Sequence, residues 1–501
     1  MCFASQLILN RMKDSVEKII KKYNSLSKPL KAALWFTVCN FALKGISFFC
    51  IPIYARLLST DEYGKMSVIV SYESIFNIFA TFELSLGAYQ RGLLKYKDDV
   101  DMFEQSIVLL SNLLTIAFTL LIVLFWRPFS GFTGFSLSIF LLMMGYFIVF
   151  TPYNCWLNRK RFAYDYKAAV AVTLSMALIS NLCPIITLNL LGKTSDIKVG
   201  STLLASILIC FPFWAKNCNF LELKKYTERV KNYFSYALKF QGPLVFHSLS
   251  YYVLNQSDRV MIGHLTNNTS AAYYSVAYSL ANVIIIFQNS LNQVLKPWRF
   301  QKLEGKNYKD VRDISNAVIV IVGAVIVFFS LLVPSVLKLM FKPEYYEAVQ
   351  SMAPVAFSVY FLFLYTIFVD VESYYGKTNY IAYVSVFCAV LNVVLNYIGI
   401  QLFGYTACAY TTLFCYIIMA FLHYGFMYKT CKEAEIKEIP VDIRFIVLFS
   451  SVMMMLFVAV SFCYYSTVIR YIACMFILIA GIWKRKDITT IIGKLTKGRK
   501  S

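Results

Sequence analysis

Charged residues are scarce in this 501-residue chain, at 15% of the sequence, whereas hydrophobic residues make up 59%. A soluble protein carries about a quarter charged residues, so the composition excludes an ordinary soluble domain. Acidic residues are fewest: 27 Asp and Glu stand against 48 Lys and Arg, a net charge of +21. A soluble chain of this charge would suggest nucleic acid, but here the composition is that of a membrane protein, and no nucleic-acid partner is expected.

The chain also lacks the spacings that bind metals or cofactors. Its 13 cysteines are scattered singly, without a CxxC pair, and its three histidines have no paired spacing. We therefore expect no metal site, no disulfide framework and no cofactor. Gly192-Lys193-Thr194 resembles the end of a phosphate-binding loop, but Thr187 stands where the upstream glycine is required. No catalytic residue is predicted, and the chain is not expected to be an enzyme.

Long apolar runs recur along the whole chain. A membrane-spanning helix needs about 20 predominantly apolar residues. The sequence predicts an all-α polytopic membrane protein with about 14 transmembrane helices. We place them at 32–55, 66–90, 105–126, 133–156, 168–191, 198–215, 240–257, 271–295, 315–337, 353–376, 379–400, 405–428, 445–466 and 468–483.

Basic residues alternate between the connections of these spans. With an N-terminus inside the cell, 38 of the 48 Lys and Arg residues fall in cytoplasmic segments. The positive-inside rule therefore predicts that both termini are cytoplasmic. None of the outside loops is long enough to form a domain.

The longest cytoplasmic segment, the basic linker 216–239, divides the chain after six spans. Weak matches at offsets of 208 and 204, such as Gly200 with Gly404, pair span one with span seven and span six with span twelve. They predict two pseudo-symmetric six-helix lobes, 32–215 and 240–428, followed by two additional C-terminal spans at 445–483. A basic amphipathic segment, 1–31, and a basic tail, 484–501, are predicted to be cytoplasmic.

Lys44 lies near the middle of the first span. An ammonium group at that depth costs about 2.5–3.5 kcal/mol, so it is expected to face protein or water rather than lipid. Ionisable groups inside a membrane usually mark substrate or ion pathways. Lys44 is therefore the first candidate site residue.

Four acids also lie inside predicted spans: Glu73 and Glu83 in span two, and Asp370 and Glu372 in span ten. Their functional interpretation is that one or more share an aqueous cavity with Lys44 and couple transport to protons or sodium. Their structural interpretation is that Glu83, Asp370 and Glu372, near helix ends, reach water or pair with Arg91 or Lys377. Glu73 is deeper and fits the structural interpretation less well.

Several motifs in register resemble the polysaccharide transport family, the flippases of lipid-linked O-antigen and capsule oligosaccharides. This family lies within the multidrug/oligosaccharidyl-lipid/polysaccharide exporter superfamily. The resemblance covers nearly the full length, with one departure, Ala271-Ala272, where the family usually has a glycine. The motifs are Arg56-Leu57-Leu58 with Glu62-Tyr63-Gly64, Ser257-Asp258-Arg259 with Tyr273-Tyr274-Ser275-Val276-Ala277, Tyr345-Tyr346-Glu347-Ala348, and Leu391–Tyr397 leading to Phe403–Ala407.

The resemblance implies alternating access by two lobes around a cationic cavity. The substrate would be an undecaprenyl-pyrophosphate-linked glycan, moved across the bacterial cytoplasmic (inner) membrane for O-antigen, capsule or exopolysaccharide synthesis. Lys44, Arg56 and Arg259 would bind it, with Asp258 among the partner carboxylates and Glu73 holding Lys44 when substrate is absent. Membrane lipids, and the polymerase and ligase of the same pathway, would be partners.

Two rival functions remain open at this point. A cation-coupled exporter of drugs or small solutes on the same fold predicts a cavity dominated by acids and aromatics, which the four acids favour. A membrane glycan polymerase or ligase would share the many spans and the basic charge, but it needs a sizeable outside loop. A transport ATPase is excluded for this chain alone, because no nucleotide-binding domain is present.

Overall fold

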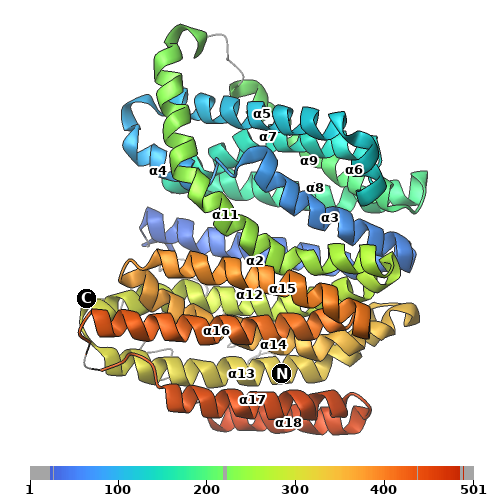
Figure 1. Ribbon diagram of the computed structural model, residues 1–501, viewed down its shortest axis with the longest axis vertical. Coiled ribbons are helices and arrows are strands. Elements are labelled where there is room, and N and C mark those ends of the chain that lie inside the picture. The colour runs from blue at the N-terminus through green and yellow to red at the C-terminus, as the bar shows by residue number, and fades with distance from the viewer. Residues whose placement is uncertain (1–22, 26, 218–222, 437, 486–488, 490–501) are drawn as a thin grey trace, which may run out of the picture. The chain divides into compact units, whose positions relative to one another are not determined.

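The structure, a computed structural model, describes residues 23–25, 27–217, 223–436, 438–485 and 489. These residues form helices and their connections, with no strand among them, which confirms the all-α fold class (Figure 1). Most of the predicted amphipathic segment 1–31, and the tail 484–501 beyond its first residues, lie outside the described residues.

The helices follow one another along the chain with short connections. Three of them are single 3-10 turns or short 3-10 segments: η1, η2 and η3. The bounds are α2 Lys28–Leu57, α3 Thr60–Thr81, α4 Gly87–Lys95, η1 Lys97–Asp99, α5 Val100–Leu124, α6 Trp126–Thr133, α7 Leu137–Phe162, α8 Tyr166–Leu191, α9 Ser195–Asn217, η2 Lys224–Tyr226, α11 Thr227–Leu265, α12 Asn268–Glu304, α13 Tyr308–Met340, η3 Pro343–Ala348, α14 Val349–Tyr374, α15 Thr378–Phe403, α16 Ala407–Glu433, α17 Ile443–Cys463 and α18 Thr467–Trp483.

Thirteen of the fourteen predicted spans each fall mainly on one of these helices, and the span at 66–90 falls on α3 and α4. Eleven helices of the described chain are long and apolar enough to cross a membrane. The other three predicted spans correspond to α3 and α11, which are more polar, and to α18, which has 17 residues. The multi-span helical class is thus confirmed, while the count of fourteen stays a prediction.

The prediction of an unbroken second span at 66–90 is wrong. α3 ends at Thr81 and α4 begins at Gly87, and the two residues that follow α3, Phe82 and Glu83, have φ angles of 50° and 49°. Positive φ is unfavourable for residues with a Cβ atom. Because neither of these two positions is a glycine or a proline, the sequence does not signal the end of α3 there. Tertiary contacts stabilise it: the Thr115 hydroxyl donates to the carbonyl of Ala80 at 2.9 Å.

Two predicted cytoplasmic connections are largely helical. α11 begins at Thr227 within the predicted linker 216–239, and α12 continues to Glu304 through the predicted connection that starts at Lys296. Charged residues ended the predicted spans there, but helices continue past the membrane surface wherever their backbone is favourable. Arg299 is consequently a helix residue rather than a loop residue.

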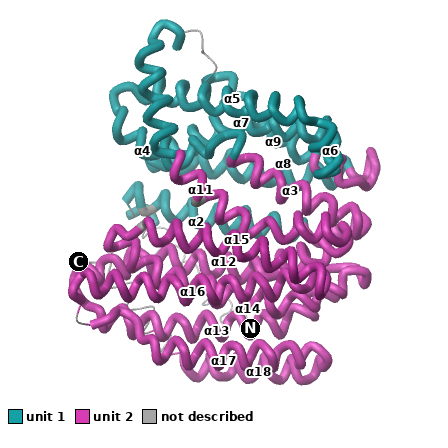
Figure 2. Tube along the Cα trace, viewed as in Figure 1, with its two compact units in different colours: residues 1–50, 79–187, 200–241 teal, residues 51–78, 188–199, 242–501 magenta. Residues whose placement is uncertain are grey.

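The chain divides into two compact units (Figure 2). Unit 1 comprises residues 1–50, 79–187 and 200–241, and unit 2 comprises 51–78, 188–199 and 242–501. The units differ from the predicted lobes in the segments 51–78 and 188–199, which belong to unit 2. Four proline-containing helices cross the division: α2 with Pro52, α8 with Pro184, α9 with Pro212 and α11 with Pro243.

Unit 1 is organised around α5, which packs against α4 and α7. The ring of Phe103 on α5 occupies the space that a side chain at Gly92 would need: a methyl group there would lie 2.1 Å from the ring. The Tyr89 ring stacks on Phe103, and its hydroxyl donates to Glu104 at 2.5 Å. A small residue on α4 thus permits the close packing of two helices.

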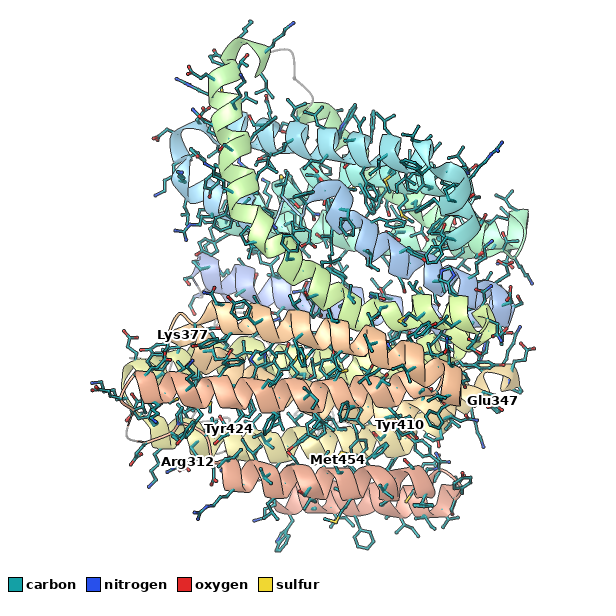
Figure 3. All side chains as sticks on the ribbon, viewed as in Figure 1. Arg312, Glu347, Lys377, Tyr410, Tyr424 and Met454 are labelled. Carbon is teal, nitrogen blue, oxygen red and sulfur yellow. The ribbon has the colours of Figure 1, made fainter. Side chains whose placement is uncertain are left out.

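Unit 2 is organised around α14, which packs against α12, α13, α16 and α17. The Phe357, Phe363 and Phe368 side chains of α14 are buried in this core. Arg312 and Lys377, both predicted to be cytoplasmic, lie at one end of these helices, and Glu347, predicted to be outside, lies at the other (Figure 3). Within unit 2, the predicted alternation of connections therefore matches the arrangement of the helices.

Candidate functional site

The first helix, α2, carries a row of polar residues among apolar ones. Thr37, Asn40, Lys44 and Ser47 recur at spacings of three and four, which places them on one face, and all four are exposed. At the neighbouring Gly45, an added methyl group would meet no atom within 4 Å. Polar side chains on a spanning helix avoid lipid, so this face of unit 1 marks a water-accessible surface. We call these four residues the α2 row.

Arg56 is bound to a helix end in unit 2. Its Nε donates to the carbonyl of Met340 at 3.2 Å and its Nη2 to that of Leu339 at 3.1 Å. These carbonyls belong to the last turn of α13, which lacks helical donors of its own, and a cation there also compensates the helix dipole. Arg56 is thus occupied by protein, whereas Lys44 on the α2 row is exposed.

The first turns of α3 are fixed by contacts within unit 2. Glu62 accepts a hydrogen bond of 2.5 Å from the backbone N–H of Ser195, where α9 begins, and Lys65 pairs with Asp196 at 3.3 Å. Gly64 lies against the start of α12. A methyl group there would come within 1.7 Å of the backbone carbonyl oxygen of Asn268, so only glycine fits.

We expect Gly64→Ala to destabilise unit 2 by about 1–3 kcal/mol, the usual cost of overpacking. The atoms that it meets are backbone atoms of Asn268, so a side-chain rotation cannot relieve the clash. Thermal unfolding of the purified protein in detergent measures the effect. Gly425→Ala on α16 is the matched control, because a methyl group there meets nothing within 4 Å. Equal losses in both variants would contradict the packing argument.

Asp258 on α11 is fully buried and is satisfied by neutral donors. The Tyr274 hydroxyl donates to it, as do the amide of Asn396 at 2.6 Å and the hydroxyl of Thr412 at 3.1 Å. Arg259 does not form an ion pair with it among the described residues. Its Nη1 donates instead to Gln256 at 2.8 Å.

The polar atoms around Asp258 form a compact cluster. The Thr411 hydroxyl donates to Asn396, whose amide also donates to Asn392 at 3.1 Å. A buried carboxylate that has only neutral hydrogen-bond donors around it lacks a compensating cation, so it is suited to take up a proton. The described residues contain no group of three or more His, Cys, Asp or Glu side chains that would hold a metal ion.

Asp370 on α14 forms a buried ion pair with α12. Its Oδ2 lies 2.6 Å from Nη1 of Arg299, a side chain with no exposed surface, and its Oδ1 lies 3.8 Å from Nζ of Lys296. The Nε and Nη2 atoms of Arg299 are buried without a partner. The structural interpretation from the sequence offered water, Arg91 or Lys377 as possible partners of this acid. The structure pairs Asp370 with Arg299 instead, and Lys377 pairs with Glu433 at 2.7 Å.

Glu372 forms a second buried pair, with His423 of α16. Nδ1 of His423 lies 3.1 Å from both carboxylate oxygens, and neither side chain is exposed. The ring of Tyr365 stacks on the imidazole. Of the alternatives that the sequence left open for Glu372, the structure shows neither water nor Lys377 beside it, because its position on α14 faces His423 of a neighbouring helix.

The remaining two acids belong to different units. Glu73 is half-buried on α3 in unit 2, whereas Glu83 is buried in unit 1 at the break after α3. Within unit 1, Glu83 forms no ion pair with Lys44 among the described residues. Lys44 and Glu73 belong to different units, so the proposed exchange of partners between them stays a prediction.

The partners of two buried acids, Arg299 and His423, were not identified from the sequence. Arg299 lies in the predicted cytoplasmic connection after span eight, and His423 lies inside predicted span twelve. A signal existed for each: a basic residue just beyond span eight and a histidine in span twelve can compensate the acids of span ten. Without knowledge of helix rotation, the sequence did not specify these pairs.

Comparison with known proteins identifies the family. Residues 30–303 match the family model described as "Polysaccharide biosynthesis protein". The chain belongs to this family. A second model, MatE, matches residues 243–398, and both models agree with the superfamily expected from the motifs.

Relatives of this family member come from an archaeon and a bacterium. "Uncharacterized membrane protein MJ1068" of Methanocaldococcus jannaschii is 23% identical over 448 residues, which is 81% of this chain and 85% of the relative. "Lsg locus putative protein 1" of Haemophilus influenzae is 24% identical over 387 residues, covering 73% of this chain and 90% of the relative. Both matches cover most of the chain, and the first relative is described as a membrane protein, in agreement with the multi-pass helical class.

The fold of this chain resembles the folds of transporters whose structures have been solved. The lipid II flippase MurJ in an inward closed conformation superposes with a TM-score of 0.68 at 15% identity, over 91% of this chain and all of MurJ. An inward-facing multidrug resistance MATE transporter gives a TM-score of 0.60 at 12% identity, over 79% of this chain and 96% of the transporter. At these identities the comparison establishes the fold alone.

Proposed function

We propose that the protein is a flippase that moves undecaprenyl-pyrophosphate-linked oligosaccharide repeat units from the cytoplasmic to the outer leaflet by alternating access. The product would supply O-antigen, capsule or exopolysaccharide synthesis. The observation that carries the proposal is the exposed Lys44 in the polar α2 row, in a chain of the polysaccharide biosynthesis family.

A pyrophosphate group explains why a lysine is present at that depth. Charge-assisted hydrogen bonds between an ammonium and phosphate oxygens are about twice as strong as neutral ones. Pairing with the anion offsets the cost of removing both charges from bulk water. Arg56 and Arg259, which contact protein groups in this structure, would become ligands only after those contacts break.

Coupling to a proton or sodium ion is assigned in this proposal to the buried carboxylates. A coupling role for Asp258 is supported by its complete burial among neutral hydrogen-bond donors. A coupling role for Glu372 is supported by its partner, His423. Asp370 is less suited, because Arg299 already neutralises it. Glu73 and Glu83 remain candidates by position alone.

A drug or small-solute exporter is the second candidate. The match of residues 243–398 to the MatE model and the buried acids of α14 favour it. A glycan polymerase or ligase is disfavoured by the short connections between helices. In the favoured proposal, such enzymes are partners in the bacterial inner membrane, alongside the surrounding lipids.

Transport in proteoliposomes tests the proposal. Lipid-linked oligosaccharide, extracted from source cells that lack the protein, is reconstituted with the purified chain, and its accessibility to an added glycosidase is followed over time. We expect protein-dependent equilibration across the two leaflets. Failure to move this lipid, combined with movement of an organic cation such as ethidium, would overturn the flippase and support the exporter.

A further inference from the structure

Over most of α12 the exposed residues are polar, unlike those of a helix that faces lipid. From Asn268 to Gln293, the exposed residues of α12 are Asn282, Asn289 and Gln293, all of them amides. In the middle of α15, by contrast, the exposed side chains are apolar or aromatic: Tyr383, Val386, Phe387, Val390, Val394, Tyr397 and Ile398. Uncharged polar groups are costly in hydrocarbon, so this face of α12 borders water.

The three amides form a straight row along the helix. Their spacings of seven and four residues, at 3.6 residues per turn, place them within about 40° of one another around the axis. At a rise of 1.5 Å per residue, the row from Asn282 to Gln293 extends over about 16 Å. We call these three residues the amide row. Its length suits an extended ligand better than a single small ring.

The hydrogen-bonding groups of the row are free. In the part of the chain that the structure describes, the side chains of Asn282, Asn289 and Gln293 form no hydrogen bond. The neighbouring Asn292 has a buried Oδ1 without a partner. Because this atom has no exposed surface, Asn292 is not part of the row, whose three amides supply the accessible hydrogen-bonding groups.

The chemistry of the row fits carbohydrate rather than phosphate. Each carboxamide has an acceptor oxygen and a two-proton donor, and each sugar hydroxyl likewise donates and accepts. The row has no charge along its length. Lys296, one turn beyond Gln293, is already 3.8 Å from Asp370.

We infer that the amide row of α12 is the binding surface for the sugar portion of the substrate, separate from the Lys44 position that would bind its pyrophosphate. This inference rests on the proposed function. It assigns recognition of the two chemical parts of the ligand to different helices: cationic recognition to α2 and neutral hydrogen bonding to α12.

The test compares two lipids on one protein. Wild type in nanodiscs is titrated with lipid-linked oligosaccharide, extracted from source cells that lack the protein, and with undecaprenyl pyrophosphate, which has no sugar. We expect the glycosylated lipid to bind at least about tenfold tighter, since several amide–hydroxyl bonds each contribute in the range of an ordinary hydrogen bond. The triple variant Asn282→Ala, Asn289→Ala, Gln293→Ala should lose this preference while its affinity for undecaprenyl pyrophosphate stays within twofold.

A matched control replaces three exposed residues of α15, Val386→Ala, Val390→Ala and Val394→Ala, and should keep the preference. If the triple amide variant does not fold, Asn289→Ala alone should reduce the preference at least threefold. A preference retained in the amide variants, or the absence of a preference in wild type, overturns the inference. Binding of neither lipid by wild type would instead overturn the proposed function.

Discussion

Replacement of Lys44 by alanine is expected to abolish lipid-linked oligosaccharide transport almost completely. Lys44 is the exposed cation of the α2 row, whereas Arg56 and Arg259 are engaged by protein groups. Hydrogen bonds to charged groups contribute about 1.5–3 kcal/mol each, and an ammonium can form more than one with a pyrophosphate. Loss of such contacts corresponds to a decrease of at least about tenfold to a hundredfold in binding. Complementation of surface polysaccharide in a deletion strain provides the measurement.

The controls for Lys44 separate charge from structure. Lys44→Arg keeps the positive charge and should retain a substantial part of the activity, whereas Lys44→Gln should resemble the alanine variant. Lys65→Ala, which breaks an exposed pair with Asp196, should retain transport. Wild-type polysaccharide levels with Lys44→Ala would show that the substrate path lies elsewhere.

Replacement of Asp370 by asparagine is expected to have the largest effect on stability. It removes the charge opposite Arg299, a side chain with no exposed surface, and so leaves a buried guanidinium without its carboxylate. The other group near Asp370, Lys296, is itself a cation and cannot replace that carboxylate. Breaking a buried ion pair by removing one partner usually costs about 3–5 kcal/mol. We expect a large decrease in the thermal unfolding temperature and in the yield of folded protein.

Asp310→Asn is the comparison for this prediction, because Asp310 pairs with Lys302 at the same distance of 2.6 Å but is half exposed. Exposed pairs contribute about 0–1 kcal/mol, so this variant should unfold near the wild-type temperature. The double variant Arg299→Met, Asp370→Leu removes both charges and should recover much of the loss. Equal stability of Asp370→Asn and Asp310→Asn would contradict the assignment of a buried pair.

The sequence predicted the helices well where apolar length decides the structure. All predicted spans but the second lie mainly on a single helix, because a run of about 20 apolar residues leaves the backbone few alternatives. The break at Phe82–Glu83 could not be predicted, since it depends on contacts with α5 rather than on a local breaker. The continuation of α12 past Lys296 was missed for a related reason: charge marks the membrane boundary, not the end of a helix.

The candidate site was predictable in its residue types but not in its pairings. A lysine or carboxylate inside an apolar span is visible in the sequence, and Lys44, Asp370 and Glu372 were found in this way. Partners depend on how each helix is rotated, which the nearly uniform apolarity of α14 and α16 does not reveal. Arg299 and His423 therefore emerged only from the packing of these helices.

The divisions between the two units have a mechanical consequence. The unit boundary crosses α2 next to Pro52, α8 four residues after Pro184, and α11 next to Pro243, while α3 is cut just before its break at Phe82. A proline removes one backbone hydrogen bond and weakens the helix against bending. Four of the chain's crossings thus coincide with points of low bending stiffness. The peptide units at these crossings can therefore absorb bending strain, and the helical segments on either side of each crossing can stay intact.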